Sequence, residues 1–171
     1  MKEQCAMTIF EAIKKRRSIR KFKPEAVVTD EQIHQMLEAA MFSPSSGNSR
    51  MWEFIVVKDR EKLDAIRAAH PYTGMLETAS IAIVVIALSH DRFGGYLPHD
   101  CGAVTENILL AAVGLGLGAC WCGVWPREDL IKATQEVLGI DKLPFCIIAV
   151  GEPDENPDPR GQYEESKVTY M

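Results

Sequence analysis

The chain contains no apolar run that approaches the roughly 18 consecutive residues that a membrane-spanning helix requires. Its first seven residues lack the apolar stretch of a secretory signal peptide. Basic residues are in the minority, 19 against 24 acidic ones, and the net charge of −5 disfavours nucleic acid as the main partner. We therefore expect a cytoplasmic protein that binds neither a membrane nor nucleic acid.

Cysteine is scarce, and the five that occur form an odd number in a chain without an export signal, which disfavours a disulfide framework. Cys120 and Cys122 are separated by a single residue, closer than the cysteine pairs of zinc sites, and no second pair accompanies them. We expect reduced, buried thiols and no metal site.

Length and composition favour one domain, because 171 residues with 47% apolar side chains can build one well-buried core. Hydrophobic periodicity and capping signals predict alternating elements. The predicted helices cover residues 8–15, 29–43, 59–69, 100–113 and 127–138, and the predicted strands cover 52–57, 81–88, 119–122 and 145–150. The strand at 81–88 is apolar throughout, so we expect it to be covered on both faces. The helix at 100–113, with Asp100 as its N-cap, is apolar enough to lie at the centre of the fold or of a dimer.

Residues 152–171 form a C-terminal tail that is rich in proline and acidic residues. Such a segment does not fold alone, although residues 168–170 have strand character. We expect the tail to become ordered on a neighbouring subunit.

The most informative stretch is the basic segment, residues 15–23, in which six of nine side chains are cationic. A phosphate dianion is bound by forked guanidinium donors together with a short hydroxyl donor, and this segment offers both in its arginines and Ser18. Ile19 and Phe22 are apolar anchors that would fix it to a core. A solvated basic patch is the alternative interpretation.

A second polar stretch is the serine loop, residues 43–52, which combines hydroxyls, an amide and a glycine before a predicted strand. It could wrap the polar atoms of a ligand, or be an ordinary turn-rich loop. The glycines at 114, 116 and 118 are not a dinucleotide fingerprint, because they end a helix and lead into a strand.

In this order, the RRSIR sequence at 16–20, the PSSGN sequence at 44–48 and the GLGACW sequence at 116–121 resemble the nitroreductase family of FMN-binding flavoproteins. The resemblance extends from Ile9 to about Tyr163. It implies an α+β fold with a central mixed, mainly antiparallel sheet surrounded by helices, a long apolar central helix, and an intertwined homodimer. The chain would be a compact member with one FMN-binding domain over 1–171, its tail packing on the partner subunit.

The resemblance also implies a set of cofactor-binding residues from four parts of the chain: Arg16, Arg17, Ser18, Arg20, Pro44, Ser45, Ser46, Asn48, Trp121, Cys122, Gly123 and Arg160. Arg16, Ser18 and Arg160 match phosphate ligands, and Arg17 matches a residue that contacts the ribityl chain or the ring. Arg20 matches a cation at the pyrimidine edge of the flavin, where it would stabilise charge that develops on reduction.

The remaining residues match contacts with the ring. The four from the serine loop would reach the flavin from the other subunit, and residues 121–123 would lie beside the isoalloxazine with the Gly123 N–H facing N5. Phe93 and Tyr96 would touch substrate from a short flap. Arg50 and Met51 stand where the family often has Gln and Pro.

The implied activity is a ping-pong reaction at the dimer interface. NADH or NADPH reduces FMN, and a small acceptor such as a nitroaromatic or quinone is then reduced on the same face. No side chain need act as a catalytic nucleophile, because the flavin carries the chemistry. The alternatives are a flavin-binding or sensor protein without turnover, a related flavoenzyme acting on halogenated or enone substrates, and a structural domain without flavin.

Overall fold

A computed structural model describes residues 7–88 and 94–171 of the chain. Its centre is a sheet of four strands, β1 (Trp52–Val57), β2 (Ile81–Ala87), β3 (Gly118–Gly123) and β4 (Leu143–Gly151), in the order β1-β2-β4-β3. Neighbouring strands are antiparallel throughout, and a parallel bridge between Ser18 and Ala119 adds to the β3 edge. The predicted α+β fold with a mainly antiparallel sheet surrounded by helices is confirmed.

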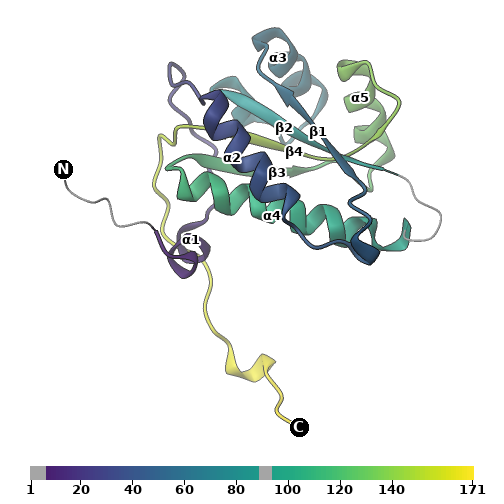
Figure 1. Ribbon diagram of the computed structural model, residues 1–171. Helices are drawn as coiled ribbons and strands as arrows, with labels where there is room; N and C mark the ends of the chain where they lie inside the picture. The colour runs from purple at the N-terminus through teal and green to yellow at the C-terminus, as the bar shows by residue number, and fades with distance from the viewer. Residues whose placement is uncertain (1–6, 89–93) are drawn as a thin grey trace.

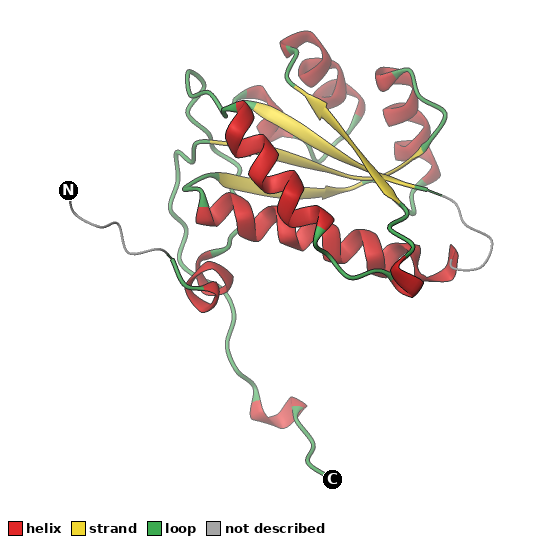
Figure 2. Cartoon of the chain, in the orientation of Figure 1, coloured by secondary structure: helices red, strands yellow, loops and turns green. Residues whose placement is uncertain are grey.

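Helices cover both faces of this sheet (Figures 1 and 2). They are α1 (Ile9–Lys15), α2 (Asp30–Met41), α3 (Arg60–Ala69), α4 (Leu97–Gly114) and α5 (Glu128–Leu138), with short 3₁₀ turns η1 (Ser46–Asn48), η2 (Gly74–Glu77), η3 (Gly94–Tyr96) and η4 (Glu165–Lys167). The helices α2 and α4 pack on one face, and α3 and α5 on the other. None of the helices in the described part of the chain is long and apolar enough to cross a membrane.

The strand β2 shows why the sequence folds this way. Its seven side chains are all buried, and they alternate between the two cores. Ile83 and Val85 belong to the core under α2 and α4, whereas Val84 and Ile86 belong to the core under α3 and α5. Because successive strand residues point to opposite faces, a continuous apolar run fits a sheet that is covered on both sides. The prediction for this strand is confirmed.

The long apolar helix α4 begins three residues before its predicted start, because Pro98 is accepted in the first turn of a helix. The prediction that Asp100 is the N-cap is therefore wrong. Asp100 lies inside the helix and is 9% exposed, and both of its carboxylate oxygens accept the Ser46 N–H at 3.1 Å. Its carboxylate joins α4 to the serine loop instead.

The C-terminal tail leaves the body of the molecule after its first residues (Figure 1). Residues 160–171 are all exposed. The expected strand at 168–170 is not formed, and a 3₁₀ turn at Glu165–Lys167 precedes these residues. Strand formation needs a partner strand, and the described chain provides none at this position.

Candidate functional site

The basic segment lies along the free edge of β3, and two apolar side chains hold it there. Ile19 is buried and its N–H donates to the Ala119 carbonyl at 3.0 Å. Phe22 is buried as well, and it forms an antiparallel bridge with Pro153 at the start of the tail. The segment is thus fixed between β3 and the tail, which places its polar side chains at defined positions rather than on a loose surface.

The arginines of the basic segment face different cavities. Arg16 and Arg17 line a cavity of about 470 Å³, together with Lys15 and the tail residue Glu155. The Arg16 Nε pairs with Glu106 of α4 at 3.1 Å, which leaves the two Nη groups of the guanidinium for another anion. Ser18 lies between Arg17 and Arg20 in the basic segment, and its backbone forms a parallel bridge with Ala119.

Arg20 lines a second cavity of about 520 Å³ at the other end of the segment. The other lining residues come from β3 and from η2 with the residues before it. They are Cys120, Trp121, Cys122 and Gly123 of β3, and Pro71, Tyr72, Gly74 and Met75. The Arg20 N–H donates to the Glu155 carboxylate at 2.5 Å, and the Lys21 N–H donates to the same carboxylate at 3.2 Å. The predicted ring contacts Trp121, Cys122 and Gly123 therefore lie together with Arg20.

The edge of β3 presents backbone groups to this second cavity. Ala119 directs its carbonyl away from β4 toward Ile19, and in a strand every second residue points the same way. Trp121 and Gly123 therefore also direct their N–H and C=O groups to the free edge. The Gly123 carbonyl forms a hydrogen bond with the imidazole Nε2 of His70 at 3.0 Å. His70 was not among the predicted site residues, since a single histidine after a helix gives no functional signal.

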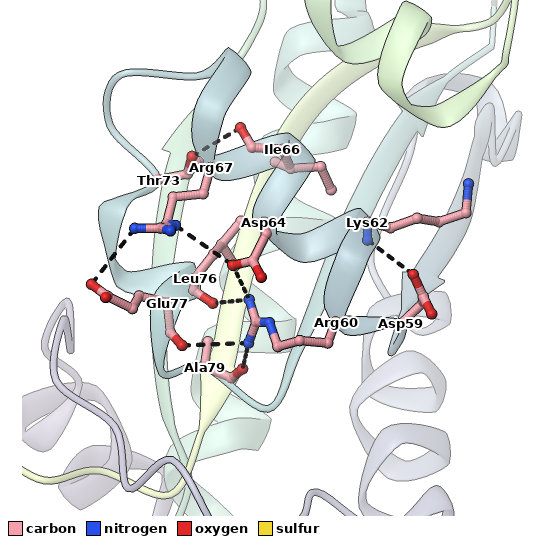
Figure 3. Close-up of polar contacts among 10 residues, drawn as sticks. All are labelled: Asp59, Arg60, Lys62, Asp64, Ile66, Arg67, Thr73, Leu76, Glu77 and Ala79. Atoms are coloured by element: carbon pink, nitrogen blue, oxygen red, sulfur yellow. Dashed lines mark hydrogen bonds and ion pairs between the residues drawn. The ribbon is translucent and has the colours of Figure 1, made fainter.

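The segment around η2 is held rigidly against α3 (Figure 3). The Arg60 guanidinium donates to the carbonyls of Leu76, Glu77 and Ala79, and it pairs with Asp64 at 3.2 Å. Arg67 bridges Asp64 and Glu77 from the same helix, at 3.6 and 3.7 Å. One wall of the second cavity is thereby attached to a helix.

The two thiols of β3 lie on its buried face, as predicted. The neighbouring Cys122 thiol, helped by the positive charge of Arg20, lowers the pKa of Cys120 to about 7. The pKa of Cys122 is raised by the same neighbouring thiol, Cys120, and by burial. Burial also raises the pKa values of Cys101 and Cys146 to about 12. Of these four free cysteines, Cys120 is the one with a lowered pKa.

The serine loop lies at the other end of α4 from α1 (Figure 1). Asn107 of α4 donates to the Ser43 hydroxyl at 2.8 Å, and Asp100 holds Ser46. The Arg50 N–H donates to the Ser45 hydroxyl at 3.0 Å, and the Arg50 Nε donates to the Asn48 side chain at 3.1 Å. Pro44 and Asn48 are exposed. Within the part of the chain that the structure describes, no hydrogen bond or salt bridge joins this loop to the basic segment.

Two other predicted residues, Arg160 and Tyr96, are not among those that line these cavities. Arg160 is exposed in the projecting tail. Tyr96, at the start of α4, is 57% exposed, with its ring 6.2 Å from that of His99. Phe93 lies outside the described residues.

The sequence model of the nitroreductase family matches residues 13–71 and 64–152. A provisionally named NADH dehydrogenase/NAD(P)H nitroreductase of Methanothermobacter thermautotrophicus is 42% identical over 165 residues, which cover 95% of this chain and 86% of that protein.

Two solved structures are similar along nearly their whole length. A provisionally named NADH dehydrogenase/NAD(P)H nitroreductase of Bacteroides thetaiotaomicron superposes with a TM-score of 0.88 at 38% identity, covering 95% of this chain and 96% of that one. An FMN-dependent nitroreductase of Clostridium difficile superposes with a TM-score of 0.84 at 34% identity, covering 93% and 96%. The chain belongs to the nitroreductase family.

Proposed function

We propose that the protein is an FMN-dependent oxidoreductase that uses NADH or NADPH to reduce small acceptors such as nitroaromatics or quinones, in ping-pong order. One observation supports this most directly: the basic segment is fixed along the open edge of β3 with Arg16 and Arg20 directed to separate cavities. The names of the relatives, which include an FMN-dependent nitroreductase, agree with it. Bound FMN would supply two-electron redox chemistry between the nucleotide and the acceptor.

The residues present fit this cofactor. Arg16 and Arg17 line the cavity at one end and supply guanidinium donors for a phosphate. The hydroxyl of Ser18, whose backbone forms a bridge with Ala119 next to them, would add a short donor. At the other end, Arg20 supplies a fixed positive charge, and β3 supplies backbone N–H groups. A Cβ built on Gly123 would meet no atom within 4 Å, so this chain leaves open space where a planar ring system could approach the backbone. These residues bind and orient, and no nucleophilic side chain is required.

We propose further that the complete site forms only in a homodimer. The serine loop residues Pro44, Ser45, Ser46 and Asn48 would reach the flavin of the partner, which accords with the place of the serine loop at the end of α4 away from α1. The tail, with Arg160 as a second phosphate ligand, would pack on the partner. The single chain leaves Phe10 of α1 72% exposed and Tyr170 of the tail 83% exposed, and such side chains gain stability when a second subunit covers them.

The free thiols of the described chain suit the cytoplasm, where thiols stay reduced, and we propose that location. Residues 1–171 would then act as one FMN-binding domain, with Tyr96 and Phe93 near the substrate.

The test is to purify the protein, add FMN, and follow NADH and NADPH oxidation with a nitroaromatic or quinone acceptor. Yellow dimeric protein that completes many turnovers supports the proposal. Protein that binds FMN but completes no second turnover would indicate a flavin-binding or sensor protein instead. Failure to take up FMN at all would contradict both interpretations.

A further inference from the structure

His70 is a buried histidine whose two ring nitrogens both have partners. It is 2% exposed, and it lies between the end of α3 and the end of β3. The Tyr72 N–H donates to Nδ1 at 3.2 Å. Since a backbone N–H can only donate, Nδ1 must carry no proton, and Nε2 therefore donates its own proton to the Gly123 carbonyl at 3.0 Å. These contacts select one neutral tautomer.

The backbone on which His70 stands is itself fixed. The His70 N–H donates to the Ile66 carbonyl at 3.0 Å, and the fully buried Thr73 hydroxyl donates to the His70 carbonyl at 2.8 Å. The Arg60 contacts then hold η2, which follows Thr73 (Figure 3). A ring carried by such a support can determine the position of a more mobile group.

Gly123 is the group that this ring contacts. It is the last residue of β3; the Val124 N–H still donates in register to the Phe145 carbonyl, and the Trp125 N–H, which donates to the same carbonyl, departs from the ladder. Glycine has more backbone freedom than any other residue, and Gly123 has no side chain that packing could fix. Its N–H points to the same free edge as its carbonyl. The two groups belong to neighbouring peptide planes, so a constraint on the carbonyl acts on the N–H by limiting the φ and ψ angles of Gly123.

We propose that His70 is a positioning residue: by holding the Gly123 carbonyl, it keeps the Gly123 N–H directed at the redox-active edge of the flavin. This rests on the proposed function, because the flavin is what the N–H would meet. His70 itself acts at the free edge of β3, through the Gly123 carbonyl.

Two substitutions separate the two contacts of the ring. His70→Gln places an amide donor near the position of Nε2, so it can still donate to Gly123 but loses most of the contact with Tyr72. His70→Asn places an acceptor near the position of Nδ1, so it keeps Tyr72 but loses Gly123. Each variant loses one hydrogen bond, and their melting temperatures should fall by similar amounts.

The readouts are the rate of flavin reduction in a single turnover with NADH, the FMN dissociation constant and the visible spectrum of bound FMN. We expect His70→Asn to slow reduction by about tenfold or more and to shift the spectrum, while its dissociation constant for FMN stays within about threefold of the wild type. His70→Gln should retain most of the wild-type rate. Equal loss of rate in both variants, or a change in stability alone, would overturn the proposal.

A measurement without flavin keeps the inference separate from the proposed function. Nitrogen NMR of the FMN-free wild type should show the His70 proton on Nε2, and amide exchange at Gly123 should be faster in His70→Asn than in His70→Gln. A proton on Nδ1 would refute the proposal even if neither variant folds. If the wild type binds no FMN, the proposed function fails, whereas these signals still report whether His70 holds Gly123.

Discussion

Gly118 and Gly151 are direct partners across the β3–β4 ladder. An apolar side chain of the basic segment packs against each of them, at the position that a Cβ atom would occupy. A Cβ on Gly118 would come within 2.8 Å of the Ile19 Cγ2, and one on Gly151 would come within 3.0 Å of the Phe22 Cδ1. The basic segment can therefore pack on β3 and β4 because these two positions have no side chains.

Gly118→Ala should destabilise the protein by about 1–3 kcal/mol, because the buried Ile19 side chain has to move aside. Urea denaturation measures this change. Gly114→Ala is the matched control, since a Cβ there meets nothing within 4 Å and Gly114 ends α4. If both variants lost equal stability, the close contact with Ile19 would not be the cause.

Arg60 and Arg67 lie on the same helix, α3, and should contribute different amounts to the free energy of unfolding. Arg60→Ala removes hydrogen bonds to backbone carbonyls and should cost about 1–3 kcal/mol of unfolding free energy. Arg67→Ala breaks only half-exposed ion pairs, and it should cost less than about 1 kcal/mol. Thermal or urea denaturation of both variants checks the order, and the reverse order would contradict it.

Combined substitution of Arg16 and Arg20 by alanine should remove most bound FMN, because each charged contact contributes on the order of 1.5–3 kcal/mol. The double variant Lys14→Ala/Lys21→Ala removes the same amount of charge and should keep its FMN. Fluorescence titration with FMN compares the two. Equal weakening in both would show that net charge alone attracts the cofactor.

Subunit mixing tests whether the site is shared. One variant would carry Arg16→Ala/Arg20→Ala and the other Ser45→Ala/Asn48→Ala, each binding little FMN alone. If basic segment and serine loop come from different subunits, random mixing yields hybrid dimers with one intact site, or about a quarter of all sites. FMN bound after unfolding and refolding the mixture measures this fraction. No recovery would mean that each chain builds its own site.

Alkylation by iodoacetamide should follow the pKa of Cys120. The thiolate is the reactive form, so the rate at Cys120 should rise with pH through about 7, below the ordinary value for cysteine. Cys101 and Cys146, with pKa values raised to about 12, should react far more slowly at pH 8. Peptide mass spectrometry identifies the modified residue, and added FMN should protect it because Cys120 lines the second cavity. Faster modification of Cys146 would contradict this order.

Local signals predicted most of the fold. The capping boxes at Thr8 with Glu11 and at Thr29 with Gln32 are formed, and the apolar run at 81–88 became the central strand β2. The exception at Asp100 has a physical reason. A carboxylate near a helix start is equally able to cap its own helix or to bind a distant N–H, and its partner Ser46 is 54 residues away.

In the candidate site, too, contacts between residues close in sequence could be predicted, whereas contacts between distant residues could not. Arg16 to Phe22 form one continuous motif, so their apolar anchors and cationic side chains could be read together. His70 and Gly123 are 53 residues apart and meet only because α3 and β3 end at the same place. Contacts between subunits leave no spacing in a single chain at all, and the family resemblance was the source of that expectation.

The first residues of the tail pair with the basic segment, through the Lys23 N–H with the Glu152 carbonyl and the Asp154 N–H with the Lys21 carbonyl. In the proposed dimer, the tail would hold a partner at one end and the FMN-binding arginines at the other. Cofactor affinity and subunit affinity would then be linked quantities, each raised by the other by the same factor. Loss of FMN would loosen the dimer, and dilution to single subunits would release FMN.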